Sequence, residues 1–183
     1  ESSPYYVFHP GVPILVKKNL PNAKFIVLLR NPADRAFSHF IMERNRDAEP
    51  EIDFFEAIKA EADRLKGTEE FLLKSPYNTS MAHQTFSYAA RGLYSAQLKR
   101  WFAHFPKTQF LFLKSEDFFA NPEQTLQKVY AFLEVDEVYP TNLQPANTAE
   151  YALLSSAQKE KLHPIFAADQ HELAQLLGDE FVW

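Results

Sequence analysis

The sequence predicts an α/β fold in which a parallel sheet is flanked by helices. Two short apolar runs, residues 24–30 and 109–114, are rich in β-forming residues and are bounded by polar or turn residues. Such continuous runs are typical of buried parallel strands. The segments around them repeat apolar residues at the helical period, and strands that alternate with helices favour α/β architecture.

The expected helices are marked by start signals and apolar faces. Residues 34–45 follow Asn31-Pro32, a cap residue with proline at the first helical position, and residues 53–65 form an amphipathic segment. The stretch 66–78 is predicted to be a loop. Further helices are expected at 80–90, 93–105, 121–133 and 155–177, the first two separated near Gly92 and the last one open to a break at Pro164.

Composition indicates one folded domain over residues 1–183. Hydrophobic residues make up 46% of the chain and aromatic residues 15%, which is ample for a core. The formal charge of −5 argues against a nucleic-acid backbone as the main partner. The chain has no cysteine, which excludes disulfides and thiolate metal sites and makes the cytoplasm the default expectation.

The first residues carry no targeting signal. They lack an initiator methionine, a basic segment and an apolar segment, and no apolar run in the chain approaches the roughly 20 residues of a membrane-spanning helix. We expect the chain to be part of a longer protein, without a membrane span.

The most informative segment runs from Arg30 to Ser38. It places a guanidinium at the carboxyl end of a strand, directly before a helix N-terminus, where free backbone N–H groups and the helix dipole suit an anion. Ser38 could add a hydroxyl to the same anion. The alternative is that Arg30 only pairs with a neighbouring carboxylate such as Asp34 or Asp117.

The pattern Arg30-Asn31-Pro32-x-x-Arg35-Ala36-x-Ser38 resembles the 3′-phosphate-binding motif of sulfotransferases that use 3′-phosphoadenosine 5′-phosphosulfate (PAPS). The resemblance implies a P-loop-NTPase-like three-layer fold, with Arg30 and Ser38 on the 3′-phosphate of the nucleotide. Further similarity to the bacterial and heparan-sulfate branches follows in the same order along the chain, at residues 1–6, 21–26, 91–106, 116–135 and 173–183.

Several features depart from the family pattern. The Gly-rich loop that cradles the 5′-phosphosulfate is absent, because none of the 4 glycines begins a run of the form Gly-x-x-Lys-x-Gly-Thr-Thr. The general base is unassigned, with Glu1 only a weak candidate. Ser2 stands where the family has lysine, and Gln97 stands where glycan-modifying animal members tend to have histidine, which puts that acceptor class in doubt.

The segment 140–156 should contain a basic loop that closes over the nucleotide, yet it has no lysine or arginine. Asn147 and Tyr151 could contact the nucleotide instead, or could simply anchor the loop. The 6 histidines are scattered without a ligand pattern, so no metal site is expected. His39 and Arg35 are expected to pack or to order the helix rather than to contact the nucleotide.

The resemblance implies an enzyme that transfers a sulfuryl group from PAPS to a hydroxyl or amine. The acceptor would be a small molecule, a carbohydrate or an acyl chain. The alternative is a catalytically degenerate nucleotide-binding or interaction module of the same fold. A P-loop kinase is a third possibility, but the chain has no Walker-type motif.

Overall fold

A computed structural model describes residues 3–140, 143 and 153–183. The chain divides into two compact units. The first contains residues up to Pro21, Asn31–Phe105 and Leu153–Trp183, and the second contains Asn22–Arg30 and residues from Pro106 to the end of the intervening segment. The single domain over residues 1–183 stays a prediction, because one domain can contain more than one compact unit.

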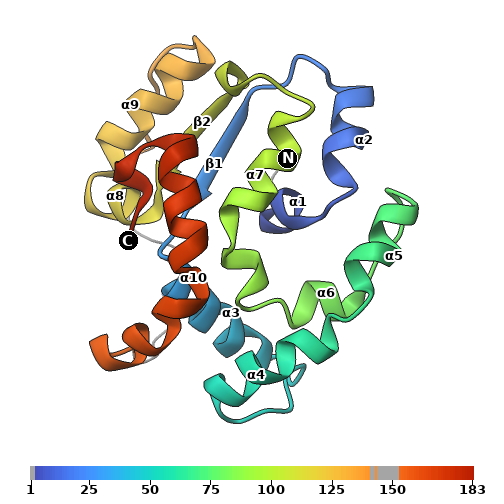
Figure 1. Cartoon of the computed structure of the whole chain (residues 1–183). Helices are drawn as coiled ribbons and strands as arrows, with labels where there is room; N and C mark the ends of the chain where they lie inside the picture. Colours follow the sequence, from blue (N-terminus) through green and yellow to red (C-terminus); the bar gives the residue numbers. More distant parts are fainter. Residues whose placement is uncertain (1–2, 141–142, 144–152) are drawn as a thin grey trace. The chain divides into compact units, whose positions relative to one another are not determined.

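The second unit is built on a two-stranded parallel sheet (Figure 1). Strand β1 is Phe25–Leu29 and strand β2 is Phe110–Lys114, with Phe25 opposite Phe110. Both predicted strands are therefore confirmed. The unit also holds the 3-10 turn η2 (Lys107–Gln109) and the helices α8 (Ser115–Ala120) and α9 (Pro122–Leu133), which contact β2.

Burial alternates along β1, so the expectation of a strand buried on both faces is wrong for it. Val27 and Leu29 are buried, whereas Ile26 and Leu28 are 43% and 47% exposed. Successive strand residues point to opposite faces, and the described residues cover only one face of β1. A continuous apolar run does not by itself reveal which of its two faces is packed.

The first unit is helical. Its N-terminal elements are α1 (Pro4–Phe8) and α2 (Val12–Asn19), followed by α3 (Pro32–Asn45), α4 (Phe54–Arg64) and α5 (Thr68–Lys74). The remaining elements are α6 (Met81–Thr85), the 3-10 turn η1 (Ala90–Gly92), α7 (Tyr94–Phe102), α10 (Ser156–Leu177) and the 3-10 turn η3 (Asp179–Phe181). The helices predicted at 34–45, 53–65, 93–105 and 155–177 are confirmed, as is α9 in the second unit.

Two predictions about local structure are wrong, and the possible break at Pro164 does not occur. The expected loop at 66–78 contains α5, which Gly67 starts from a left-handed conformation with φ of 75°. The expected helix at 80–90 is shortened to α6, because the chain leaves the helix at Phe86. Helix α10 continues through Pro164, whose exposed position lets water satisfy the backbone group that proline leaves unpaired.

The core of the first unit joins α3, α4 and α10. Phe40 and Phe54 pack with ring centroids 5.4 Å apart, and Tyr88 and Phe166 close the same cluster. Ala36 and Ala57 are completely buried where α3 and α4 meet this cluster. These contacts hold α3, the helix that begins directly after Arg30 and Asn31, in a fixed orientation within the unit.

Candidate functional site

The start of α3 is capped by its own preceding residue. The side-chain Oδ1 of Asn31 accepts hydrogen bonds from the backbone N–H groups of Ala33 and Asp34, at 3.0 and 3.2 Å. Pro32 has no N–H, and the N–H of Arg35 is bonded to the carbonyl of Asn31. The cap predicted from Asn31-Pro32 is thus confirmed.

This cap corrects the expectation that the helix start offers free N–H groups to an anion. All the backbone donors in the first turn of α3 already have acceptors within the chain. An anion bound here would have to be held by side chains, with the helix dipole as a secondary contribution.

In the sequence, one predicted phosphate-binding residue precedes this cap and the other follows it. Arg30 directly follows β1 and belongs to the second unit. Ser38 belongs to α3 in the first unit, where its side chain is half-buried, one helical turn beyond Asp34. Asp34, one of the carboxylates considered as a partner for Arg30, pairs with Lys159 of α10 at 2.6 Å.

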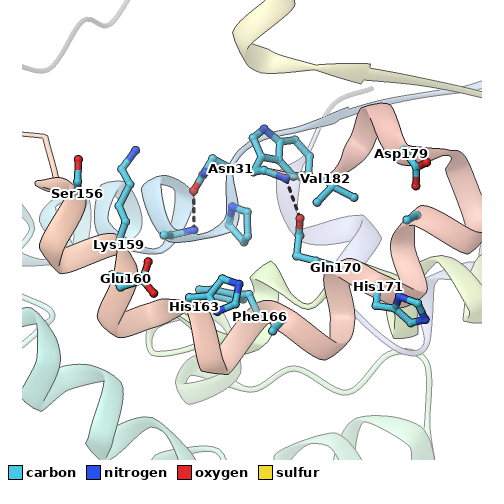
Figure 2. Close-up of a pocket in the computed structure, with 15 residues that line it drawn as sticks. Asn31, Ser156, Lys159, Glu160, His163, Phe166, Gln170, His171, Asp179 and Val182 are labelled. Carbon is cyan, nitrogen blue, oxygen red and sulfur yellow. Dashed lines mark hydrogen bonds between the residues drawn. The ribbon is translucent and has the colours of Figure 1, made fainter.

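A groove of about 570 Å³ runs along α10 and passes the α3 cap at Asn31 (Figure 2). Ser156, Lys159 and His163 line one end, and Asp179 and Val182 line the other. All the lining residues belong to the first unit. Ser38 does not line the groove.

Gln170 is the buried polar residue of this groove, with 8% exposure. Its Oε1 accepts the backbone N–H of Trp183 at 3.0 Å, as Figure 2 shows. Because that bond fixes the orientation of the amide, Nε2 is the free end, and none of the described residues accepts a hydrogen bond from it. The amide nitrogen of Gln170 is therefore an unused donor in the lining of the groove.

Glycine at position 92 allows close packing behind the groove. A side chain there would bring a Cβ atom to 3.0 Å from Phe166 Cε1 and 3.1 Å from Pro32 Cβ. These two residues lie on α10 and α3 and both line the groove. Gly92 thus lets η1 pack where the two helices approach each other.

Arg35 and His39 are involved in packing, as expected. Arg35 donates a hydrogen bond to the carbonyl of Tyr88, and the His39 ring lies 5.0 Å from the Tyr88 ring. His39 is 6% exposed. Its burial, reinforced by the charges of Arg91, Arg35 and Arg46, lowers its pKa to about 2, so this imidazole is neutral at physiological pH.

The remaining residues singled out from the sequence divide into two groups. Glu1, Ser2, Asn147 and Tyr151 lie outside the residues that the structure describes. Gln97 is 2% exposed and its amide nitrogen donates to three backbone carbonyls. Within the described ranges, no group of three or more histidine and acidic side chains is arranged to hold a metal ion, and no helix is long and apolar enough to cross a membrane.

Sequence reasoning missed the buried polar pairs of the first unit. Tyr5 Oη and His83 Nδ1 are 2.7 Å apart, and Asp169 bonds the start of α7. Each pair joins residues more than 70 positions apart in the chain. Apolar periodicity and capping patterns carry no signal for contacts over that separation.

Comparison with known proteins identifies the class. A family model described as "Sulfotransferase domain" matches residues 3–169 of this chain, and that span contains the whole Arg30-to-Ser38 motif. The chain therefore belongs to the sulfotransferase family. This agrees with its α/β structure, a parallel sheet flanked by helices, and confirms the fold class implied by the motif resemblance.

Individual relatives agree with this family. A sulfotransferase structure from Alicyclobacillus acidocaldarius is 28% identical with a TM-score of 0.72, covering 94% of this chain and 62% of that one. The membrane-associated sulfotransferase kil1 of Dictyostelium discoideum is 24% identical over all of this chain and 52% of its own length. Human carbohydrate sulfotransferase 15 is 29% identical over 89% of this chain and 31% of its own length. This chain thus spans about half or less of these two relatives.

Proposed function

We propose that this chain is the nucleotide-gripping part of a sulfotransferase that uses PAPS as the sulfuryl donor. The observation that carries the proposal is the complete Arg30-to-Ser38 motif inside the span that matches the sulfotransferase family model. Arg30 would bind the 3′-phosphate of the nucleotide through its guanidinium, and Ser38 would donate its hydroxyl hydrogen to the same group.

Side chains must provide this grip, since the Asn31 cap already uses the first N–H groups of α3. A guanidinium is suited to the task because its planar donors match two phosphate oxygens at once. The Ser38 hydroxyl would add one further hydrogen bond to the same phosphate. The 3′-phosphate is also the feature that separates PAPS from adenosine 5′-phosphosulfate, so this pair of residues would set donor specificity.

The reaction proposed is an in-line transfer. The acceptor oxygen or nitrogen forms a bond to sulfur, the bond from sulfur to the bridging phosphate oxygen breaks, and the acceptor loses its proton to a base. The products are a sulfated acceptor and adenosine 3′,5′-bisphosphate. The acceptor would be a small molecule, a carbohydrate or an acyl chain, and a carbohydrate is favoured by the name of one relative, carbohydrate sulfotransferase 15.

Calorimetric titration tests the nucleotide grip directly. Adenosine 3′,5′-bisphosphate should bind at least tenfold more tightly than adenosine 5′-monophosphate. Arg30→Ala should remove that preference. Arg30→Lys should retain only part of it, because an ammonium group lacks the paired planar donors of a guanidinium. Ser38→Ala should weaken binding of the bisphosphate about fivefold. Arg46→Ala is the matched control, because this arginine lies at the other end of α3 and its side chain is 63% exposed.

Equal affinity for the two nucleotides in a folded chain would overturn the proposal. Binding that depends on Arg30, without sulfated product from any acceptor by the longest natural form of the protein, would instead support the alternative of a catalytically degenerate nucleotide-binding module. The sequence that precedes residue 1 in the longest natural form separates the two, because a Gly-Lys-Thr-type loop there would favour the enzyme.

A further inference from the structure

A second, smaller cavity lies among α1, α5, α6 and α7 of the first unit. Its volume is about 200 Å³. The residues that matter for its chemistry are Phe8, Glu69, His83, Gln97 and Arg100. It is separate from the groove along α10, and no lining residue is shared between the two.

His83 lines this cavity and has one ring nitrogen without a partner among the described residues. The residue is 3% exposed, its ring stacks on Phe8 with centroids 4.1 Å apart, and its Nδ1 lies 2.7 Å from Tyr5 Oη. That nitrogen is the one acceptor for the Tyr5 hydroxyl hydrogen among the described residues, so Tyr5 donates and Nδ1 accepts. The ring proton is then on Nε2, which bonds to none of the described residues.

Gln97 lines the same cavity, and its amide oxygen has no partner among the described residues. Its Nε2 donates to the carbonyls of Leu93, Arg91 and Ala90, at 2.7, 3.1 and 3.4 Å. These carbonyls fix the orientation of the amide, because a rotated amide would place oxygen against oxygen. Oε1 is therefore the free end, and no residue in the described ranges donates to it, although Gln97 is only 2% exposed.

The cavity has no unbalanced charge on its lining side chains. Arg100 is paired with Glu69, and it also donates to the carbonyl of Phe8 at 3.3 Å. Burial, with the charges of Arg91, His9 and Arg100, lowers the pKa of His83 to about 4, so its ring is neutral at physiological pH. A neutral ligand would meet one donor and one acceptor without having to displace an ion pair.

We propose that this cavity binds a neutral, hydroxyl-bearing group of the size of one sugar ring. A hydroxyl both accepts and donates, so it complements His83 Nε2–H and Gln97 Oε1 together, and the Phe8 ring and Leu93 provide apolar contact for ring carbons. The volume is below the roughly 300 Å³ at which pockets enclose a whole drug-sized ligand, which suits one ring of a larger molecule. That this molecule is the sulfuryl acceptor rests on the proposed function, whereas the binding itself does not.

Nitrogen NMR of the histidine rings tests the proposal. The chain is labelled with ¹⁵N in its imidazoles and titrated with methyl β-D-glucopyranoside, with glucuronate and with tetrahydropyran, a ring without hydroxyls. We expect His83 to be in the Nε2-protonated tautomer, and its signals to shift saturably as the glucoside is added. Tetrahydropyran should cause no shift, and glucuronate should bind at least tenfold more weakly than the glucoside.

Ala96→Leu is the variant of choice, because Ala96 lines the cavity and is exposed, so a larger side chain can block the space without removing a bond. It should weaken glucoside binding at least tenfold. His163→Phe, on the groove along α10, is the control and should bind as the parent chain does. Gln97→Leu provides a second loss-of-binding variant if it folds.

The proposal is overturned if the folded parent chain shows no saturable shift, which would mean that the cavity holds water only, or if glucuronate binds as tightly as the glucoside. Unchanged binding by Ala96→Leu would also overturn it. Adenosine 3′,5′-bisphosphate is titrated into the same sample in parallel. Glucoside binding without nucleotide binding would support the proposed sugar site and count against the proposed function. Nucleotide binding without glucoside binding would support the proposed function and overturn the sugar site.

Discussion

Asp169 of α10 caps α7 through Tyr94: its Oδ2 accepts the backbone N–H of Tyr94 at 2.8 Å. Its Oδ1 accepts the N–H of Ser95 at 2.9 Å and the Ser95 hydroxyl at 2.6 Å. One buried carboxylate therefore satisfies three donors at the start of a helix that it does not belong to. This is how α10 holds α7, the helix that carries Gln97.

Replacing Asp169 should destabilise the first unit. Asp169→Ala leaves the buried backbone N–H groups of Tyr94 and Ser95 without an acceptor and leaves the Ser95 hydroxyl with Glu172 alone, so we expect the free energy of unfolding to fall by about 3 kcal/mol. Asp169→Asn retains a carbonyl oxygen and should cost about 1 kcal/mol. Urea unfolding monitored by tryptophan fluorescence measures both.

Glu172→Ala is the matched control, three residues along the same helix. Glu172 is exposed and bonds Lys99 and Ser95 at the surface, so its loss should cost less than about 1 kcal/mol. Equal costs for Asp169→Ala and Glu172→Ala would show that the cap does not stabilise the fold.

Glu49 holds a second buried network. Its carboxylate accepts hydrogen bonds from Arg64 at 2.6 Å, from Tyr88 Oη at 2.7 Å and from the backbone N–H of Glu51 at 2.7 Å. Burial raises the pKa of Glu49, but the bonds from Arg64, Tyr88 and Glu51 outweigh it, so the net pKa lies below its usual value. The carboxylate is therefore ionised at neutral pH.

Breaking this network should be costly. Glu49→Ala leaves the Arg64 guanidinium, which is 18% exposed, without its main partner, and we expect a loss of about 3 kcal/mol. Glu51→Ala, which removes only a longer ion pair of 3.7 Å to the same arginine, should cost well under 1 kcal/mol. Thermal unfolding followed by circular dichroism would contradict the prediction if the two variants had the same midpoint.

The pH dependence of stability should report His83. Because its folded pKa is lowered from 6.5 to about 4, the unfolded chain binds more protons between these values, and stability is lost as pH falls from 6.5 toward 4. His83 alone should remove about 2 kcal/mol between pH 7 and pH 5. His39, whose pKa is lowered to about 2, acts in the same direction.

His83→Phe retains a ring against Phe8 but cannot be protonated. Its unfolding free energy should therefore change less between pH 7 and pH 5 than that of the parent chain, by about 2 kcal/mol. His163→Phe, at an exposed site on α10, should keep the full pH dependence. Parallel pH profiles for the parent chain and His83→Phe would show that His83 is not buried in its neutral form.

Local signals in the sequence determined much of the secondary structure and one candidate site. The β-forming runs at Phe25–Leu29 and Phe110–Lys114, and the Asn31-Pro32 start of α3, depend on residues adjacent in the chain. The Arg30-to-Ser38 motif is also a short continuous segment, and it predicts membership of the sulfotransferase family. The short helix α5 escaped prediction because no apolar period distinguishes its seven residues from a loop.

The tertiary structure alone decided which polar groups meet. Asp169 caps α7 across 75 positions of the chain, and Tyr5 orients His83 across 78. Which distant side chains come together depends on helix packing, and the free energy gained by pairing a buried polar group appears only once that packing excludes water. The sequence therefore determined the local elements and the nucleotide motif, whereas the fold determined the hydrogen-bond partners of His83 and Gln97 at the small cavity.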